Sequence, residues 1–335
     1  MTRRAKLSSL AKINLDLRVL NKNPDNFHEL RTVFQTVSLA DTIEIEYTPS
    51  RKTELTIDDP QAIPDNLILR AARATLDALR LTAKVRFRLA KKIPMGGGLG
   101  GGSSNAATVL LALPVLAGRT LPLDRAIEIG ATLGSDVPFF LLGGTALALG
   151  RGTELYPLPE IASEQLLILS TGLHIATAPA YAALGRSLTF MGASSSINSF
   201  QSYVRALVAS RSAGAASALS ANDFESAVSG QFPQFKKIRA KLSRLGAAGV
   251  RMTGSGSAVV AIFGSRPDSR EVRERARTML LRDRMFEGCR VMPAALVSRR
   301  SYRALWRRQL SGHILNEHVG NPGAEVWPLP SRYER

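Results

Sequence analysis

Glycine dominates one short stretch of the sequence, residues 96–102, where six of the seven positions are glycine. Glycine adopts positive φ angles easily and lets a ligand approach the main chain without meeting a Cβ. A helix-forming run follows from about Ser103, and the first turn of a helix offers N–H groups and partial positive charge to an anion. The stretch therefore predicts a phosphate-binding loop. Its residues are Pro94, Met95, Gly96, Gly97, Gly98, Leu99, Gly100, Gly101, Gly102, Ser103 and Ser104.

Other kinds of glycine-rich segment fit this loop less well. A Walker A loop ends in Gly-Lys-Ser or Gly-Lys-Thr, whereas no lysine precedes the serines here. The dinucleotide fingerprint is formally matched, but residues 84–91 before the loop alternate apolar and basic side chains, as in a strand with one solvated face. Asp124, at about the distance of a ribose-binding acid, is expected to be the N-cap of a new helix. A flexible linker is disfavoured because a strand and a helix flank the loop.

Two charged residues, Asp136 and Lys12, have surroundings that suggest chemistry. Asp136 lies among apolar and turn residues at 134–140, where reduced solvation would raise its basicity. It could accept the proton of an attacking hydroxyl in phosphoryl transfer, or it could serve only as an N-cap. Lys12 lies in a mostly apolar strand at 10–15. It is predicted to be either an edge residue with a packed stem or a buried cation with a matching carboxylate.

Four separated blocks of the sequence resemble the GHMP small-molecule kinases. They are residues 11–15 together with 25–30, the glycine loop, residues 133–140 and residues 252–257. The resemblance implies an α+β, two-lobed fold with the active site in the cleft between the lobes, and a kinase that uses ATP and Mg²⁺. Residues 11–15 and 25–30 resemble those of one branch of this family. The members of that branch phosphorylate a hydroxyl of a cytidine diphosphate ester in isoprenoid precursor synthesis. The expected partners are therefore ATP and this small molecule.

The resemblance also implies roles at the reacting centre. Lys12 would lie beside Asp136, where it would polarise the acceptor hydroxyl and keep the carboxylate ionised. Asn14 would form hydrogen bonds with the substrate. Gly254 and Ser255, in a second glycine-containing turn, would approach the loop or the substrate.

For the nucleotide, the resemblance implies that the glycine loop wraps the phosphates. Asn66 and Lys92 would lie near the nucleoside. Mg²⁺ would be held through the ATP phosphates, because this ion keeps several waters and takes oxygens from phosphate. Either Ser103 or Ser104 would offer a hydroxyl to the ion or to the β-phosphate.

The resemblance implies that three residues recognise the cytosine base by stacking and by hydrogen bonds, namely Phe27, His28 and Tyr181. The family usually has tyrosine before this histidine, and phenylalanine keeps the stacking surface while losing one hydroxyl. The nearer alternative function is another GHMP kinase, acting on homoserine, a mevalonate-like alcohol or a sugar. Phe27 and His28 argue against that alternative.

The pattern along the chain indicates an N-terminal domain at 1–158, a C-terminal domain at 159–300 and a basic extension at 301–335. The Ser- and Ala-rich residues 192–221 are expected to include a loose surface segment. Asp65 or Asn66 is expected to cap the first helix. The elements expected are strands at 12–20, 43–47, 84–91 and 165–170, helices at 66–79 and 104–113, and a strand-turn-strand at 249–263.

The net charge of +17 suggests a different class of function, because such a basic chain is typical of nucleic-acid-binding proteins. The densest cluster, residues 299–308, interleaves five arginines with Tyr302 and Trp306. At helical spacing it would form a basic amphipathic helix able to touch nucleic acid or anionic lipid. Because no nucleic-acid module accompanies the charge, a solvated helix face is favoured. The excess charge would then attract polyanionic substrates.

The remaining composition points to an ordinary intracellular enzyme. The single cysteine, Cys289, excludes an internal disulfide. No stretch reaches membrane-spanning length, and the first basic residues lie too close to a strand to form a targeting peptide. A cytoplasmic location without a membrane partner is expected.

Overall fold

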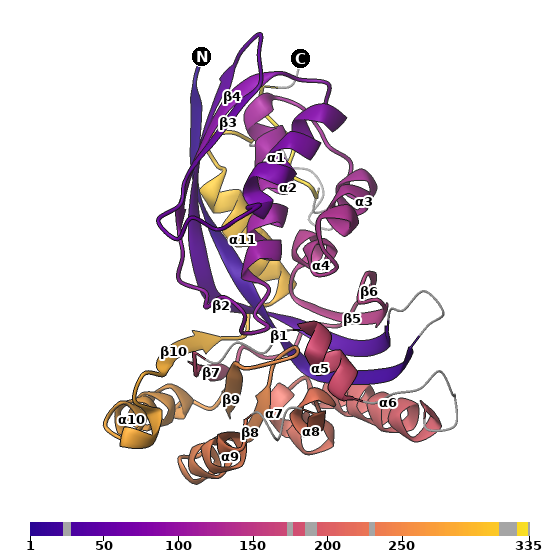
Figure 1. Ribbon diagram of the computed structural model, residues 1–335, viewed down its shortest axis with the longest axis vertical. Helices are drawn as coiled ribbons and strands as arrows, with labels where there is room; N and C mark the ends of the chain where they lie inside the picture. The colour runs from indigo at the N-terminus through magenta and orange to yellow at the C-terminus, as the bar shows by residue number, and fades with distance from the viewer. Residues whose placement is uncertain (23–27, 173–176, 185–192, 228–231, 315–326, 334–335) are drawn as a thin grey trace.

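Two long strands run through both lobes of the molecule. The computed structural model describes residues 1–335 except 23–27, 173–176, 185–192, 228–231, 315–326 and 334–335 (Figure 1). The antiparallel strands β1 (Arg3–Lys22) and β2 (His28–Pro49) run from one lobe into the other. Their register shifts between Leu10 and Lys12 and again between Asn14 and Asp16. The two polar residues singled out from this strand, Lys12 and Asn14, thus lie in its irregular middle.

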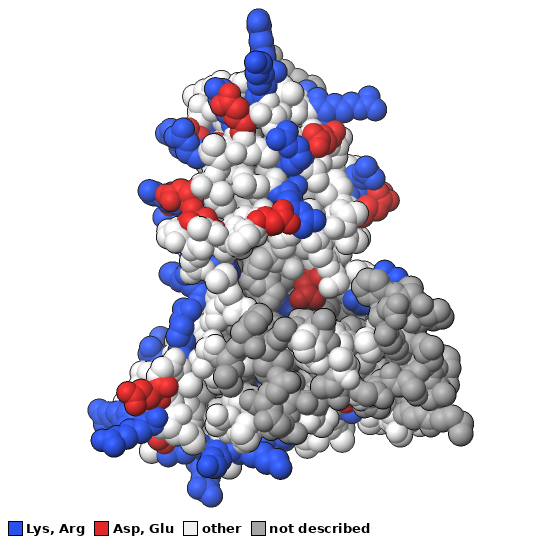
Figure 2. Space-filling view, in the orientation of Figure 1, with Lys and Arg blue, Asp and Glu red and all other residues white. Residues whose placement is uncertain are grey.

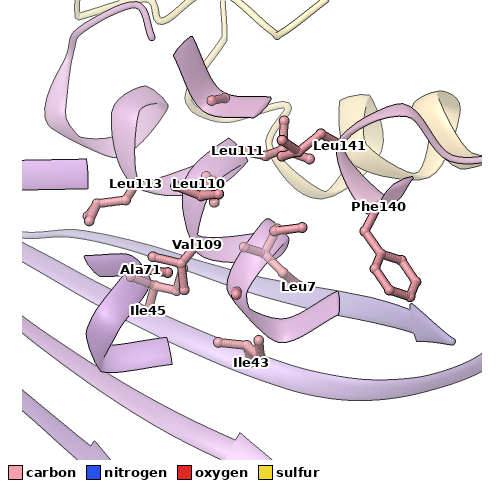
Figure 3. Packing of buried hydrophobic residues seen from close by; sticks show 14 of the residues in the cluster. Leu7, Ile43, Ile45, Ala71, Val109, Leu110, Leu111, Leu113, Phe140 and Leu141 are labelled. Carbon is pink, nitrogen blue, oxygen red and sulfur yellow. The ribbon is translucent and has the colours of Figure 1, made fainter. Parts of the chain in front are cut away.

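The first lobe is a sheet covered on one face by helices. Within the described chain its six strands run in the order β3-β4-β2-β5-β6, with β1 paired to β2. Buried and exposed residues alternate strictly along β4, so one face of the sheet meets the helices and the other meets water. Figure 3 shows Leu7, Ile43 and Ile45 of the sheet in one core with Val109 and Leu110 of α2. The other elements of this lobe are β3 (Glu54–Asp58), α1 (Leu67–Ala78), β4 (Ala83–Ala90), α2 (Gly101–Ala117), α3 (Leu123–Leu133), α4 (Val137–Leu142), β5 (Thr145–Gly150) and β6 (Glu154–Pro157).

The second lobe is built on a smaller sheet. Its four described strands lie in the order β10-β7-β9-β8. The middle of the long strand pair packs on this sheet, because Ala11, Ile13 and Val33 share a hydrophobic core with Ile168 and Val260. The lobes therefore share β1 and β2. The elements are β7 (Gln165–Ser170), α5 (Thr177–Ala183), α6 (Ala193–Ser210), α7 (Ala213–Ala216), η2 (Ser217–Leu219), α8 (Phe224–Ala227), α9 (Gln234–Arg244), β8 (Gly249–Met252), β9 (Val259–Gly264), α10 (Ser269–Leu281), η3 (Arg284–Phe286) and β10 (Arg290–Ala295).

The arginine-rich segment forms α11 (Arg299–Gln309), which returns to the first lobe (Figure 1). Tyr302 and Trp306 are 2% and 1% exposed and belong to the core of that lobe. The helix therefore turns its aromatic residues inward, and its exposed face is the charged one. The predicted extension at 301–335 begins inside this packed helix. Figure 2 shows Lys and Arg side chains on both lobes, several of them over α9 and α10.

Most of the predicted elements are confirmed, with three corrections. The helix after the glycine loop begins at Gly101 and continues through Pro114 to Ala117, beyond the predicted 104–113. Asp124 is not an N-cap, because α3 begins at Leu123 with Pro122 at the capping position. Most of residues 193–219, within the stretch expected to include a loose segment, is helical, since Phe200, Tyr203 and Leu207 recur at helical spacing and are all buried. No helix in the described parts of the chain has both the length and the apolar character to cross a membrane.

Candidate active site

The glycine loop lines a cavity of about 350 Å³ together with the residues that open α1. Gly96, Gly98 and Gly100 have φ between 68° and 73°, in the left-handed region that favours glycine. Gly100 is the N-cap of α2 and provides no side-chain cap, so the first-turn N–H groups of this long helix remain available to an anion. The cavity is lined by residues 63–67, 94–103, Lys91 and Asn105.

The two serines after the loop have different surroundings. Ser103 lines the cavity. Ser104 is 1% exposed, and its hydroxyl donates to the Leu10 carbonyl at 2.6 Å and accepts from Ser9 at 2.7 Å. Of the two predicted serines, Ser103 therefore faces the cavity, while the side chain of Ser104 fastens α2 to β1.

Asn66 lies at the cavity and caps α1, since its Oδ1 accepts from the Ile68 N–H at 3.0 Å. The capping prediction is thus confirmed for Asn66. Lys91 is the basic residue that lines this cavity, whereas the family resemblance had implied that Lys92 lies near the nucleoside. Lys91 is paired with the buried Asp41, which holds the start of the loop by also accepting from the main-chain N–H of Lys92 at 2.7 Å.

A second cavity of about 240 Å³ adjoins the first, and Gly98 lines both. Lys12 and Asp136 lie on its wall, with Lys12 Nζ 3.4 Å from Asp136 Oδ2. Lys12 is 4% exposed and is therefore the buried cation with a carboxylate partner. Asp136 stands at the N-cap position of α4 but forms no side-chain capping bond. The Asp136 carboxylate therefore does not cap α4. It faces Lys12 and the cavity instead.

Asn14 connects three parts of the second cavity. Its Oδ1 accepts from Lys12 Nζ at 2.8 Å and from the Gly254 N–H at 3.0 Å, and its Nδ2 donates to Thr32 Oγ1 at 2.7 Å. Gly254 and Ser255 line the same cavity from the turn between β8 and β9. The Asn14 amide therefore holds Lys12 and the turn of the second lobe in one arrangement.

Tyr181 and Phe224 line one side of this cavity, and His28 packs against Tyr181 without lining the cavity itself. The rings of His28 and Tyr181 stack with centroids 4.6 Å apart and planes 27° apart, and Tyr181 meets Phe224 edge-on. Burial, with the charge of Asp136 as the second cause, raises the pKa of Tyr181 to about 12. The phenol is therefore neutral near pH 7. Phe27, the third predicted base-binding residue, lies outside the described residues.

Sequence reasoning missed several residues of the second cavity. Arg151 lines it from the turn between β5 and β6, and Thr32 and Phe34 line it from β2. The local signal for Arg151 was its position between two glycines, Gly150 and Gly152, both with positive φ. Thr32 and Phe34 carry no such signal, because an alternating strand supplies similar residues at many positions.

Comparisons with known proteins agree with this architecture. The model of the GHMP kinases N terminal domain matches residues 66–144, and that of the GHMP kinases C terminal matches residues 181–280. A protein from Solibacter usitatus (strain Ellin6076) named 4-diphosphocytidyl-2-C-methyl-D-erythritol kinase is 50% identical over 99% of this chain and 98% of its own. The chain belongs to the GHMP kinase family. It is therefore a phosphotransferase of the class that uses ATP, as the sequence resemblance implied.

Solved structures place the fold in the same family. A crystal structure of 4-(cytidine 5'-diphospho)-2C-methyl-D-erythritol kinase matches with a TM-score of 0.67 and 33% identity, over 88% of this chain and 99% of that one. Homoserine kinase from Cytophaga hutchinsonii matches with a TM-score of 0.64 at 17% identity, over 88% of this chain and 97% of its own, which shows the shared fold alone. The expected two-lobed α+β kinase fold is thus confirmed.

Proposed function

We propose that this GHMP kinase transfers the γ-phosphoryl group of ATP to a hydroxyl of 4-diphosphocytidyl-2-C-methyl-D-erythritol, a step in isoprenoid precursor synthesis. The relatives that carry this name support the choice of substrate. The observation that carries the chemistry is the Lys12–Asp136 pair on the wall of a cavity that adjoins the glycine-loop cavity at Gly98. A donor in one cavity and an acceptor alcohol in the other would meet beside this pair.

Asp136 acts as the general base in this proposal. Its carboxylate takes the proton of the acceptor hydroxyl as the oxygen forms a bond to the γ-phosphorus and the bond from that phosphorus to ADP breaks. Lys12, 3.4 Å away, polarises the hydroxyl and stabilises the negative charge of Asp136. Asn14 holds Lys12 in place through the 2.8 Å hydrogen bond to its Oδ1.

The residues around the glycine loop fit ATP. A Cβ at Gly100 would lie 2.8 Å from the Phe140 ring, so this position requires glycine for packing. The backbone of the loop lines the cavity in which the phosphate oxygens would bind. Asn66 and Lys91 lie where the nucleoside and phosphates would contact the wall. Mg²⁺ would neutralise charge on the phosphates, and Ser103 is the hydroxyl that would contribute to holding it.

The aromatic side of the second cavity suits a cytosine base. His28 offers a hydrogen-bonding ring edge, and Tyr181 offers a flat face and a neutral hydroxyl. Arg151 brings positive charge to the same cavity, which suits an acceptor that carries a diphosphate. We assign Phe27 to the same base site by family likeness.

The test is ADP release from ATP and Mg²⁺ with this acceptor, and with homoserine and mevalonate as competing alcohols. Asp136→Asn should lower kcat by roughly 10²- to 10⁴-fold, the usual effect of losing a positioned base. The control Asp124→Asn changes an exposed carboxylate in the first turn of α3 and should leave kcat unchanged. Turnover of another alcohol in place of the cytidine ester would overturn the substrate. Full turnover by Asp136→Asn would remove that residue as the base.

A further inference from the structure

The short helix α4 is held at its far end by two aromatic side chains from the C-terminal part of the chain. The Tyr302 hydroxyl donates to the Phe140 carbonyl at 2.6 Å, and Trp327 Nε1 donates to the Leu141 carbonyl at 2.7 Å. Tyr302 is 2% exposed, and its ring lies against Gly143, where a Cβ would collide with it. The third carbonyl of this end, that of Phe139, accepts from the Gly143 N–H at 2.8 Å.

These bonds matter because α4 has only six residues. The last four carbonyls of a helix have no partner within it, so in a helix this short the outside contacts decide where it lies. A buried carbonyl without a partner is costly, and here each of the three has one donor. The position of α4 is therefore set in part by Tyr302 and Trp327.

The other end of α4 leads directly to the candidate catalytic pair. Asp136 occupies the N-cap position, one residue before the helix begins. Along the helix, the Phe140 ring packs where a Cβ on Gly100 would meet it at 2.8 Å, and the stem of Lys12 lies 3.0 Å from the same point. A shift of α4 would thus change the placement of Asp136 relative to both Lys12 and the glycine loop.

We propose that Tyr302 and Trp327 are positioning residues for phosphoryl transfer, which act through α4 on the carboxylate of Asp136. This inference rests on the proposed role of Asp136 as the base. It gives the C-terminal segment a part in catalysis although neither aromatic residue lines the two cavities.

The experiment compares Tyr302→Phe and Trp327→Phe with a matched control, Ser331→Ala. Ser331 is buried in the same C-terminal segment, but its hydroxyl donates to the Val115 carbonyl of α2 at 2.7 Å. All three variants remove one side-chain hydrogen-bond donor, and only the first two remove it from α4. Hydrogen exchange of α4 amides, kcat and KM for ATP are measured at a temperature where every variant is folded.

The two α4 variants should lower kcat about tenfold, since a small misplacement of a reacting group is enough for that, with KM for ATP changed by less than about twofold. Exchange of the α4 amides should be at least about fivefold faster, because the helix loses an outside tether. Ser331→Ala should change neither quantity. When Tyr302→Phe is combined with Asp136→Asn, its effect on kcat should disappear, because both changes act on one group.

Three results would overturn the inference: an unchanged α4 exchange rate in both aromatic variants, an equal loss of kcat in Ser331→Ala, or a full effect of Tyr302→Phe in the Asp136→Asn background. If Tyr302→Phe does not fold, Trp327→Phe decides the matter alone. Failure of the proposed function looks different, because Asp136→Asn by itself would then keep wild-type turnover. The exchange measurement would still show whether the two aromatic residues hold α4.

Discussion

Gly98 and Gly254 bring the two lobes into contact at the candidate site. A Cβ on Gly98 would collide with the Thr253 carbonyl, and a Cβ on Gly254 would lie 3.0 Å from Gly98 Cα. Both residues also have positive φ, of 73° and 58°. Each glycine is therefore needed twice, once for its backbone conformation and once for the close approach of the other turn.

Gly98→Ala should weaken ATP binding by at least about tenfold, because the added Cβ forces apart the loop and the turn and strains a left-handed residue. The control Gly288→Ala has a φ of 77° but nothing within 4 Å of its Cβ, far from the site. It should lower stability by about 1 kcal/mol through strain alone and leave the ATP affinity within about twofold. Calorimetric titration with a non-hydrolysable ATP analogue measures the ATP affinity of the two variants. Equal affinities in the two variants would contradict the contact argument.

At the scale of single elements, α11 shows how a charged pattern can belong to a core helix. Its exposed arginines suggested a surface for nucleic acid or lipid, whereas its two aromatic residues lie in the core of the first lobe. Trp306 also meets Trp327 edge-on, at 6.4 Å between centroids. The helix is therefore held by aromatic packing, while Arg300 and Arg308 are exposed and Arg299 donates to the Thr145 carbonyl.

Trp306→Ala should lower the free energy of unfolding by about 3–5 kcal/mol, the usual cost of truncating a large buried aromatic side chain. The matched change on the exposed face of the same helix, Arg308→Ala, should alter it by less than about 0.5 kcal/mol. Urea denaturation of both variants measures the difference. A loss in Arg308→Ala as large as that in Trp306→Ala would mean that charge, and not packing, holds α11 in place.

At the scale of the whole molecule, buried charges join the shared strand to the second lobe. Asp16 on β1 accepts from Arg18 and from the Ala221 N–H, and Arg251 on β8 donates to the Ser217 carbonyl. Burial lowers the pKa of Arg251 and raises that of Asp16. These opposite shifts have one cause, because removal from water disfavours the charged form of either group.

Glu225, near Arg251, makes stability depend on pH. Burial raises the pKa of Glu225 above the ordinary 4.5. The hydrogen bond that its carboxylate accepts from the Met252 N–H lowers the pKa, but by less. The folded protein thus holds this proton more tightly than the unfolded chain does. The resulting stabilisation is complete below the unfolded pKa and is lost as pH rises through the folded pKa.

Glu225→Gln keeps an acceptor for the Met252 N–H and removes the titration. Its free energy of unfolding, relative to wild type, should therefore increase between about pH 4 and about pH 7. The control Glu271→Gln removes an exposed carboxylate paired with Arg275 and should shift by less than about 0.5 kcal/mol over the same range. Denaturant titrations at several pH values give both differences. A relative stability of Glu225→Gln that stays flat or falls with pH would refute the argument.

By itself the sequence predicted the residues of the candidate site and determined the family of the fold. The glycine loop, the strand before it and the helix after it are local features, because turn conformation and helix initiation depend on neighbouring residues. Lys12 and Asp136 stood out for a similar reason, as charges within apolar runs. The GHMP family blocks were readable because their residues lie close together in the chain.

Only the tertiary structure decided how distant segments meet. It turned Ser103 rather than Ser104 toward the cavity, placed Lys91 on the cavity wall and brought Arg151 to the second cavity. It also packed the C-terminal aromatic residues against α4. Such contacts depend on which side of a helix or strand is buried and on what lies opposite. That choice is made by the packing of the whole core, which no local stretch of sequence contains.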